Sequence, residues 1–170
     1  MRNLLRVSRL PILVGWALFS GCSWFSSTPE TPPLVRKIDL RLIASQHINP
    51  GGNSQGQPVK ICVIETDLDG WSPPGLYRGT PCSDIHTSDK VLSVSQYMLA
   101  PSETLQYARE VPFDQDRWLV IAAEFQNMGQ GQNLIQLKSS ARTDFNPVVR
   151  VEGSTLTLLI STTSDVSKEE

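Results

Sequence analysis

Residues 34–44 read LVRKIDLRLIA, and apolar and polar side chains alternate along this stretch. Ile38, Leu40 and Leu42 fall on one side, and the charged residues between them fall on the other. Because successive side chains of a strand point to opposite faces, this alternation predicts a β-strand with one buried and one solvent-exposed face. We therefore expect the folded part of the chain to begin here with a strand.

Further stretches downstream carry strand signals, and turn-forming residues separate them. They are residues 58–66, 91–99, 104–111, 118–125, 133–138, 147–153 and 154–162. The segment 118–123 is nearly all apolar, which predicts a central strand covered on both faces. In the last stretch we expect Leu156, Leu158 and Ile160 to face inward. Short strands with turn signals at fairly regular spacing predict an all-β sandwich.

The segment 67–90 is the least regular part of the chain. It contains several prolines, so any helix within it must be short, and Asp84 or Ser88 are candidates to cap a single turn. An uninterrupted loop of this length is unusual in a compact domain. We therefore expect the segment to carry short structure or a function.

The N-terminus has the pattern of a secretory signal. Residues 1–9, MRNLLRVSR, contain Arg2, Arg6 and Arg9 and no acidic residue, and an uncharged apolar run follows over residues 10–19. That run is shorter than the roughly 20 apolar residues that a membrane-spanning helix needs. We therefore predict a cleaved signal peptide rather than a spanning helix.

Cys22 follows Ser20 and Gly21 directly after the apolar run. This arrangement resembles the lipobox of bacterial lipoproteins, in which the cysteine thiol receives a diacylglyceryl group, cleavage occurs before it, and its new amine takes a third acyl chain. The family prefers Leu three residues before the cysteine, where Phe19 stands here. The resemblance implies that Cys22 is a lipid anchor. A plain signal peptide with a nearby cysteine is the alternative.

These patterns divide the chain into four parts. We expect a signal peptide at 1–21, a lipid-anchored tether at 22–33, a β-sandwich domain at 34–163 and a disordered tail at 164–170. The tether reads SWFSSTPETPP after the cysteine, and its serines and prolines leave no periodicity. Ser23 stands where enterobacterial-type lipoproteins retained in the inner membrane carry Asp, which implies an outer-membrane location facing the periplasm.

The charge of the processed chain disfavours nucleic-acid binding. The full sequence has 15 Lys and Arg against 17 Asp and Glu, and removal of Arg2, Arg6 and Arg9 leaves 12 against 17, a net charge of −5. An acidic chain does not bind polyanions by charge. The same charge disfavours electrostatic attachment to an anionic membrane face.

Two cysteines remain beyond the anchor, Cys62 and Cys82. In an oxidising periplasm such a pair predicts a disulfide, which would contribute about 3 kcal/mol on the chain-entropy model. Two unpaired thiols are the alternative, since spacing alone does not bring Cα atoms together.

The sequence shows no pattern typical of an enzyme. His47 and His86 are the only histidines, and no His-x-His, Glu-x-x-His or Cys-x-x-Cys spacing is present. There is no Gly-x-Ser-x-Gly elbow, and the glycines of residues 51–56 lack the Lys-Ser or Lys-Thr of a phosphate-binding loop. We expect no catalytic residue, no metal site and no cofactor.

Several motifs, taken in order, resemble one family. Asn49-Pro50 and then Gly56-Gln57-Pro58 lead into a strand, Leu99-Ala100-Pro101-Ser102-Glu103 forms a later turn, and a strand runs from Leu119 to Phe125. With the lipoprotein signal, this order resembles the outer-membrane lipoprotein of the type VI secretion system, the TssJ or SciN family. Ser102 and Gln126 depart from the family, which usually has Gly and Arg at these places.

The resemblance implies a fold, a partner and a contact loop. The family fold is a transthyretin-like β-sandwich of two four-stranded sheets with short helical or loop insertions. Its members act as structural scaffolds that bind the periplasmic C-terminal region of the inner-membrane protein TssM, largely through the loop between the first two strands. The implied partner-binding residues are Ile48, Asn49, Pro50, Gly51, Gly52, Asn53, Ser54, Gln55, Gly56 and Gln57.

Two other classes remain open from the sequence. One is a pilotin or assembly lipoprotein of another secretion system, which would share the anchor and the acidic sandwich. The other is a periplasmic enzyme or ligand-binding lipoprotein, which requires a concave pocket with convergent polar groups.

Overall fold

The structure, a computed structural model, describes residues 34–127, 129 and 131–165 of the 170-residue chain. Over this part of the chain it contains eight strands and one short 3-10 turn, η1 (Leu76–Arg78). The strands are β1 (Val35–Ala44), β2 (Val59–Thr66), β3 (Val91–Leu99), β4 (Thr104–Pro112), β5 (Arg117–Glu124), β6 (Leu134–Ser139), β7 (Thr143–Glu152) and β8 (Thr155–Asp165). Each stretch with strand signals holds one of them, which confirms the prediction of an all-β fold.

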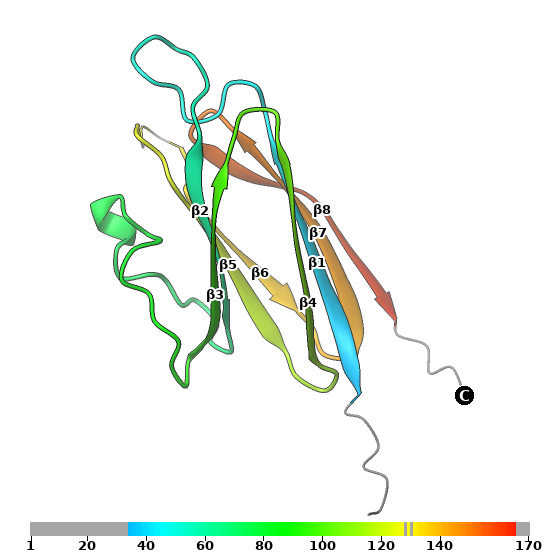
Figure 1. Ribbon diagram of the computed structural model, residues 1–170. Helices are drawn as coiled ribbons and strands as arrows, with labels where there is room; N and C mark the ends of the chain where they lie inside the picture. The colour runs from blue at the N-terminus through cyan, green and yellow to red at the C-terminus, as the bar shows by residue number, and fades with distance from the viewer. Residues whose placement is uncertain (1–33, 128, 130, 166–170) are drawn as a thin grey trace, which may run out of the picture. The chain divides into compact units, whose positions relative to one another are not determined.

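The strands form two four-stranded sheets, which Figure 1 shows facing each other. Sheet A has the order β4-β1-β7-β8, and sheet B has the order β3-β2-β5-β6. β1 pairs in parallel with β7, whereas the other neighbouring pairs are antiparallel. Apolar side chains of both sheets meet in one large core, so the predicted sandwich of two four-stranded sheets is confirmed.

The inward face of β1 supplies much of this core. Ile38, Leu40 and Leu42 are each 0% exposed, in agreement with the alternation along residues 34–44. Burial of each such side chain contributes about 1.5–3 kcal/mol relative to an exposed one. The first strand is therefore an anchor of sheet A rather than an edge.

The central strands of sheet B are buried on both faces, as predicted for β5. On the outer face, Cys62, Ile64, Val120 and Ala122 form a second apolar cluster. Residues 67–90 cover this cluster, with Trp71 and Ile85 among the side chains that pack on it. The irregular segment thus completes the packing of sheet B.

Residues 67–90 contain only the three-residue η1. The N-cap position of η1 is Gly75, which makes no side-chain capping bond. The predicted caps lie elsewhere: Ser88 Oγ accepts a hydrogen bond from the Val91 N–H at 3.1 Å, and so fixes the entry to β3. Asp84 lies in a left-handed conformation with φ of 58°.

The C-terminal hairpin corrects two expectations. β7 begins at Thr143, four residues before the predicted strand, because Phe145 packs into the core and Ile38 pairs with it. A bulge between Val148 and Val149 shifts the register of β8, so Val149 pairs with Leu158 and Val148 pairs with Ile160. Leu156 is buried as predicted, but Leu158 and Ile160 are 39% and 54% exposed. The bulge interrupts the alternation and puts Ile160 on the side of Val148, whereas Leu158 pairs with buried Val149 and is exposed because β8 is the end strand of its sheet.

A buried arginine closes the end of the sandwich where β1 begins. Arg36 is 1% exposed, and its guanidinium donates to Ser139 Oγ at 2.6 Å, to the Ser139 carbonyl at 3.0 Å and to the Gln115 carbonyl at 2.8 Å. Burial, followed by repulsion from Arg117, lowers the pKa of Arg36. These hydrogen bonds tie β1 to the ends of the β4–β5 and β6–β7 connections.

A second polar link crosses between the sheets. Glu65 of β2 is 2% exposed, accepts a hydrogen bond from the Tyr107 hydroxyl of β4, and lies 3.3 Å from Arg109 Nε. Burial and the hydrogen bond to Glu65 raise the pKa of Tyr107 well above its ordinary value. A buried carboxylate that keeps two partners joins sheet B to an edge strand of sheet A.

Candidate functional site

The candidate site is the connection between β1 and β2, residues 45–58, at one end of the sandwich. In Figure 1 it is the long cyan-to-teal loop that rises above the sheets. The β3–β4 turn supports its base, because the Ala44 N–H donates to the Glu103 carbonyl at 2.9 Å and the Ser102 N–H donates to the Ser45 carbonyl at 3.2 Å. The loop therefore rises from a fixed platform of neighbouring turns.

Ser102 holds the tip of that supporting turn. Its φ is 63°, in the left-handed region that Gly adopts without steric cost. This conformation gives a physical reason for the Gly that the family named above usually has at this place. Serine adopts it here at an energetic cost.

Asn49 is the structural centre of the loop. Its backbone N–H donates to the Gly153 carbonyl at 2.7 Å, and its side-chain Nδ2 donates to the Pro58 carbonyl at 2.8 Å. Its Oδ1 accepts a hydrogen bond from the Gln126 N–H at 2.7 Å. With φ of 46°, the residue occupies the left-handed region, which Asn tolerates better than most residues. One side chain thus connects both ends of the loop to the strands beneath it.

Two of the predicted contact residues are not available to a partner. Ile48 is 0% exposed within the main core, and Asn49 is 2% exposed. The expectation that Ile48 supplies an apolar contact surface is therefore wrong, because the core buries that side chain. Ile48 acts through its backbone instead, since its carbonyl accepts from the Gln57 N–H at 2.9 Å and closes the neck of the loop.

The remaining residues, 50–57, form the projecting part of the loop. Gly52, Asn53, Ser54 and Gln55 are exposed, and the other four are half-buried. The Ser54 N–H donates to the Gly51 carbonyl at 2.9 Å, and the Gly51 N–H donates to the Gln55 carbonyl at 3.2 Å. These internal bonds hold the tip in one conformation while its amide side chains face outward.

Gly56 permits the return of the loop to sheet B. A Cβ atom at this position would lie 2.2 Å from the Gln46 carbonyl oxygen, which no side chain tolerates. The close passage of the two backbone segments creates an open groove of about 420 Å³. Its lining is Gln46, His47, Ser54, Gln55, Gly56 and Pro101. His47 is the only titratable side chain among them, so the groove presents hydrogen-bonding groups rather than permanent charges.

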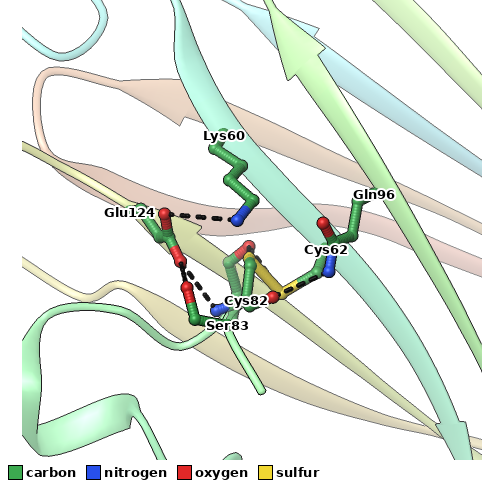
Figure 2. The surroundings of a disulfide bond; sticks show 7 residues. Lys60, Cys62, Cys82, Ser83, Gln96 and Glu124 are labelled. Atoms are coloured by element: carbon green, nitrogen blue, oxygen red, sulfur yellow. Dashed lines mark hydrogen bonds and ion pairs between the residues drawn. A yellow bond between two sulfur atoms is a disulfide. The ribbon is translucent and has the colours of Figure 1, made fainter. Parts of the chain in front are cut away.

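Cys62 and Cys82, the predicted pair, are joined Sγ to Sγ, with their Cα atoms 5.5 Å apart (Figure 2). The bond connects β2 to residues 67–90 on the outer face of sheet B. It lies outside the loop of residues 45–58. Its position indicates a structural function, which is to hold the covering segment on the sheet.

Polar contacts surround the disulfide. Glu124 Oε1 accepts from the Cys82 N–H at 3.0 Å and from Ser83 Oγ at 3.2 Å, and Glu124 Oε2 lies 3.7 Å from Lys60 Nζ. Gln96 Nε2 donates to the Cys82 carbonyl at 2.7 Å. Figure 2 shows these groups converging on the cysteine from three strands of sheet B. The covering segment is therefore fixed by hydrogen bonds as well as by the covalent bond.

The predicted lipid anchor, Cys22, lies outside the described residues. Among the residues that the structure does describe, no group of three or more His, Cys, Asp or Glu side chains is placed to hold a metal ion. No helix within the same residues is long and apolar enough to cross a membrane.

Sequence reasoning missed the residues that support the loop from other strands. Gln126 holds Asn49 through its backbone and Gln57 through its side chain, with Gln126 Nε2 donating to Gln57 Oε1 at 2.9 Å. Gly153, in the β7–β8 turn, accepts from Asn49. The only available signal was the departure from the family pattern at Gln126. Contacts across 77 residues of sequence leave no local trace.

Comparison with known proteins identifies the family. The family model T6SS-SciN, described as Type VI secretion lipoprotein, VasD, EvfM, TssJ, matches residues 36–154. No curated protein sequence matches the chain.

Solved structures share the fold. The T6SS lipoprotein TssJ1 from Pseudomonas aeruginosa is similar at 14% identity and a TM-score of 0.59, covering 80% of this chain and 100% of that one. Serratia marcescens Lip, a membrane-bound component of the type VI secretion system, is 19% identical with a TM-score of 0.57, and the match covers 74% of this chain and 98% of that one. A structure described as the T6SS protein TssM C-terminal domain from EAEC is 16% identical with a TM-score of 0.55, and the match covers 74% of this chain and 98% of that one. The family match over most of the described sandwich, together with this shared fold, places the chain in the type VI secretion lipoprotein family.

Proposed function

We propose that the protein is a lipid-anchored scaffold of the type VI secretion membrane complex. Cys22 carries the lipid at the outer membrane, and the sandwich faces the periplasm. The projecting loop, residues 50–57, binds the periplasmic C-terminal region of a TssM-like inner-membrane protein. No catalytic step forms part of this function.

The observation that carries the proposal is the contrast between the base and the tip of the loop. Asn49 is 2% exposed and makes three hydrogen bonds to other segments, whereas Asn53 and Gln55 are exposed at the tip. A loop that is ordered before binding loses less conformational entropy when it docks. Exposed amides on a rigid base are therefore well suited to bind a polar partner surface.

A long Gly-rich connection can also be a solvated link without a binding function. The connection crosses from sheet A to sheet B, so part of its length is needed for the crossing, but its internal hydrogen bonds and the groove beside it favour recognition. Because His47 is the only titratable group in the groove, binding should depend weakly on salt.

The test is a loop variant that preserves the supporting residues. Residues 51–55 are replaced by a shorter Gly-Ser turn, while Asn49, Gly56 and Gln57 are retained. Affinity for the periplasmic fragment of the TssM-like partner is measured by titration calorimetry at two salt concentrations, beside a thermal melting curve. We expect a folded variant with affinity reduced by about tenfold or more.

The matched control is Gln106→Ala. Gln106 is an exposed amide on β4 whose side chain donates to Asp39, and it lies on sheet A outside the loop. We expect this variant to bind like the wild type. A folded loop variant with unchanged affinity would show that the partner binds elsewhere.

A further inference from the structure

Two paired residues of sheet B, Lys60 and Glu124, connect the disulfide region to the loop of residues 45–58. Glu124 ends β5 and Lys60 is the second residue of β2, and the sheet register pairs them. Lys60 Nζ lies 3.7 Å from Glu124 Oε2 (Figure 2). Lys60 comes two residues after the loop, and Glu124 comes two residues before Gln126. A movement of either side of this ion pair therefore reaches the loop through very little backbone.

The residues at the disulfide hold Glu124 from the other side. The Cys82 N–H and the Ser83 hydroxyl both donate to Glu124 Oε1, at 3.0 and 3.2 Å. The Glu124 side chain is only 19% exposed, so water replaces these donors incompletely. A partly buried carboxylate that loses its donors is destabilised where it stands. The position of Glu124 therefore depends on the position of Cys82.

Gln126 carries this dependence to the loop. Its N–H donates to Asn49 Oδ1 at 2.7 Å, and its Nε2 donates to Gln57 Oε1 at 2.9 Å. Asn49 Nδ2 donates to the Pro58 carbonyl at 2.8 Å, two residues before Lys60. Both ends of the loop are thus tied to backbone that adjoins the ion pair.

The covalent bond determines whether the segment around Cys82 stays in place. Cys62 and Cys82 are each 0% exposed and belong to the apolar cluster on the outer face of sheet B. Two thiols need more room than a disulfide, because sulfur atoms that are not bonded stay at van der Waals distance. A closely packed site must open to hold them. Reduction of the bond therefore displaces Cys82 from β2.

We infer that the Cys62–Cys82 disulfide is a redox-sensitive control of the loop of residues 45–58. With the bond formed, Cys82 holds Glu124, and the backbone up to Gln126 holds the loop in its ordered conformation. With the bond reduced, the loop loses this support and samples other conformations. This control reaches partner binding only through the proposed function, in which residues 50–57 are the contact, so that an unoxidised chain docks poorly.

The redox step is a thiol–disulfide exchange. The two thiols of the exported chain lose two electrons and two protons as the Cys62–Cys82 bond forms. A protein disulfide of the oxidising periplasm accepts the electrons and protons and becomes a dithiol. A dithiol reductant reverses both changes. The chain therefore orders its loop fully only after oxidation.

The experiment measures amide hydrogen exchange of the full-length chain in detergent. The reporting amides are the N–H groups of Gln57 and Gln126, which donate to Ile48 and Asn49 at the base of the loop. This readout needs no partner protein. We expect both amides to exchange about tenfold faster or more when the disulfide is removed by Cys62→Ala with Cys82→Ala.

Further samples separate the bond from its surroundings. Glu124→Ala should accelerate exchange at the same amides while the disulfide stays intact. The wild-type chain treated with a dithiol should exchange like the chain without the disulfide, and reoxidation should restore it. Val120→Ala is the matched control, because it removes apolar contacts from the same cluster but keeps the disulfide, and it should exchange like the wild type.

Three results would overturn the inference. They are unchanged exchange in the chain without the disulfide, unchanged exchange in Glu124→Ala, and equal acceleration in Val120→Ala.

A calorimetric titration with the periplasmic fragment of the TssM-like partner tests the proposed function separately. We expect the chain without the disulfide to bind about tenfold more weakly. Faster exchange in the loop with unchanged affinity would support the redox control of the loop and contradict the proposed binding role of residues 50–57.

Discussion

Asn49 and Gln126 are joined by a hydrogen bond of 2.7 Å from the Gln126 backbone N–H to the Asn49 side-chain oxygen. The loop after β1 is thereby fixed to the residue that follows β5 by two positions, across the end of the sandwich. The Asn49 side chain also donates to the Pro58 carbonyl, so its loss removes two hydrogen bonds, whereas the bond from the Asn49 backbone N–H to Gly153 remains.

We predict that Asn49→Ala lowers the free energy of unfolding by about 2–4 kcal/mol. The change leaves a buried N–H and a buried carbonyl without partners and places Ala in a left-handed conformation. Asn49→Gly should cost less, because Gly adopts this φ freely and only the hydrogen bonds are lost. Urea unfolding of both variants separates the cost of the lost hydrogen bonds from the cost of placing Ala in a left-handed conformation. Equal stability of the Ala variant and the wild type would contradict this view of the loop.

Ser102→Gly should stabilise the protein by about 0.5–1 kcal/mol, since Gly removes the strain of a φ of 63° but loses more entropy on folding. The midpoints of urea unfolding of Ser102→Gly and the wild type measure this difference in stability. Ser54→Gly is a useful comparison, because Ser54 has a φ of 61° in the loop tip. A destabilised Ser102→Gly variant would indicate that the serine side chain makes a favourable contact.

Removal of the disulfide by Cys62→Ala with Cys82→Ala should lower the free energy of unfolding by about 3 kcal/mol, as expected for a sequence separation of 20 residues. We expect residues 67–90 to lose hydrogen-exchange protection while the main core keeps its own. In the wild-type chain, the intact mass without reductant should be two hydrogens below that of the reduced chain. Two titratable thiols in unreduced protein would contradict the bond.

Tyr107→Phe should destabilise the protein by about 1–3 kcal/mol at pH 7, because buried Glu65 loses a hydrogen bond. The pKa of Tyr107 is raised in the folded state, so its contribution is full below the unfolded pKa of about 10 and falls as the pH rises above it. The difference in the free energy of unfolding between the wild type and Tyr107→Phe should therefore become smaller above about pH 10, by up to about 1.4 kcal/mol per pH unit. Urea titrations between pH 8 and 10.5 measure this difference. A free-energy difference that stays constant over that range would indicate that folding does not raise the pKa of Tyr107.

Cys22→Ser should abolish lipid attachment, because acylation requires the thiol. Cells are labelled with palmitate, and the membrane and soluble fractions are compared. The variant without the disulfide, Cys62→Ala with Cys82→Ala, keeps Cys22 and should remain labelled. Label on the Cys22→Ser chain in the outer-membrane fraction would contradict the anchor.

The sequence predicted the strands and the sandwich because alternation and turn residues are local signals. It placed Ile38, Leu40 and Leu42 in the core correctly, and it identified the strand before Phe125 as a central one. These features depend on neighbouring residues within one strand, so a single sequence contains them.

What the sequence did not show depends on distant partners. Alternation placed Ile160 inward, but a bulge against Val148 turned it out. Polar residue type placed Asn49 at the surface and gave no reason to bury Arg36, but hydrogen bonds to remote segments hold both inside. Residue type gives the cost of burying a polar group, whereas the fold determines whether its partners are present.

The parallel pairing of β1 with β7 has a consequence for how the chain folds. Ile38 pairs with Phe145, and the Lys37 N–H meets the Asp144 carboxylate across 107 residues. The first strand of the domain therefore cannot complete its sheet until β7, almost the last strand, is available to pair with it. Closing so long a loop before its contacts form is slow, and non-local β-proteins fold in milliseconds to seconds. Until β7 pairs with it, β1 has an unpaired edge and an incompletely covered apolar face, so this interval is the one in which the protein is most prone to aggregate.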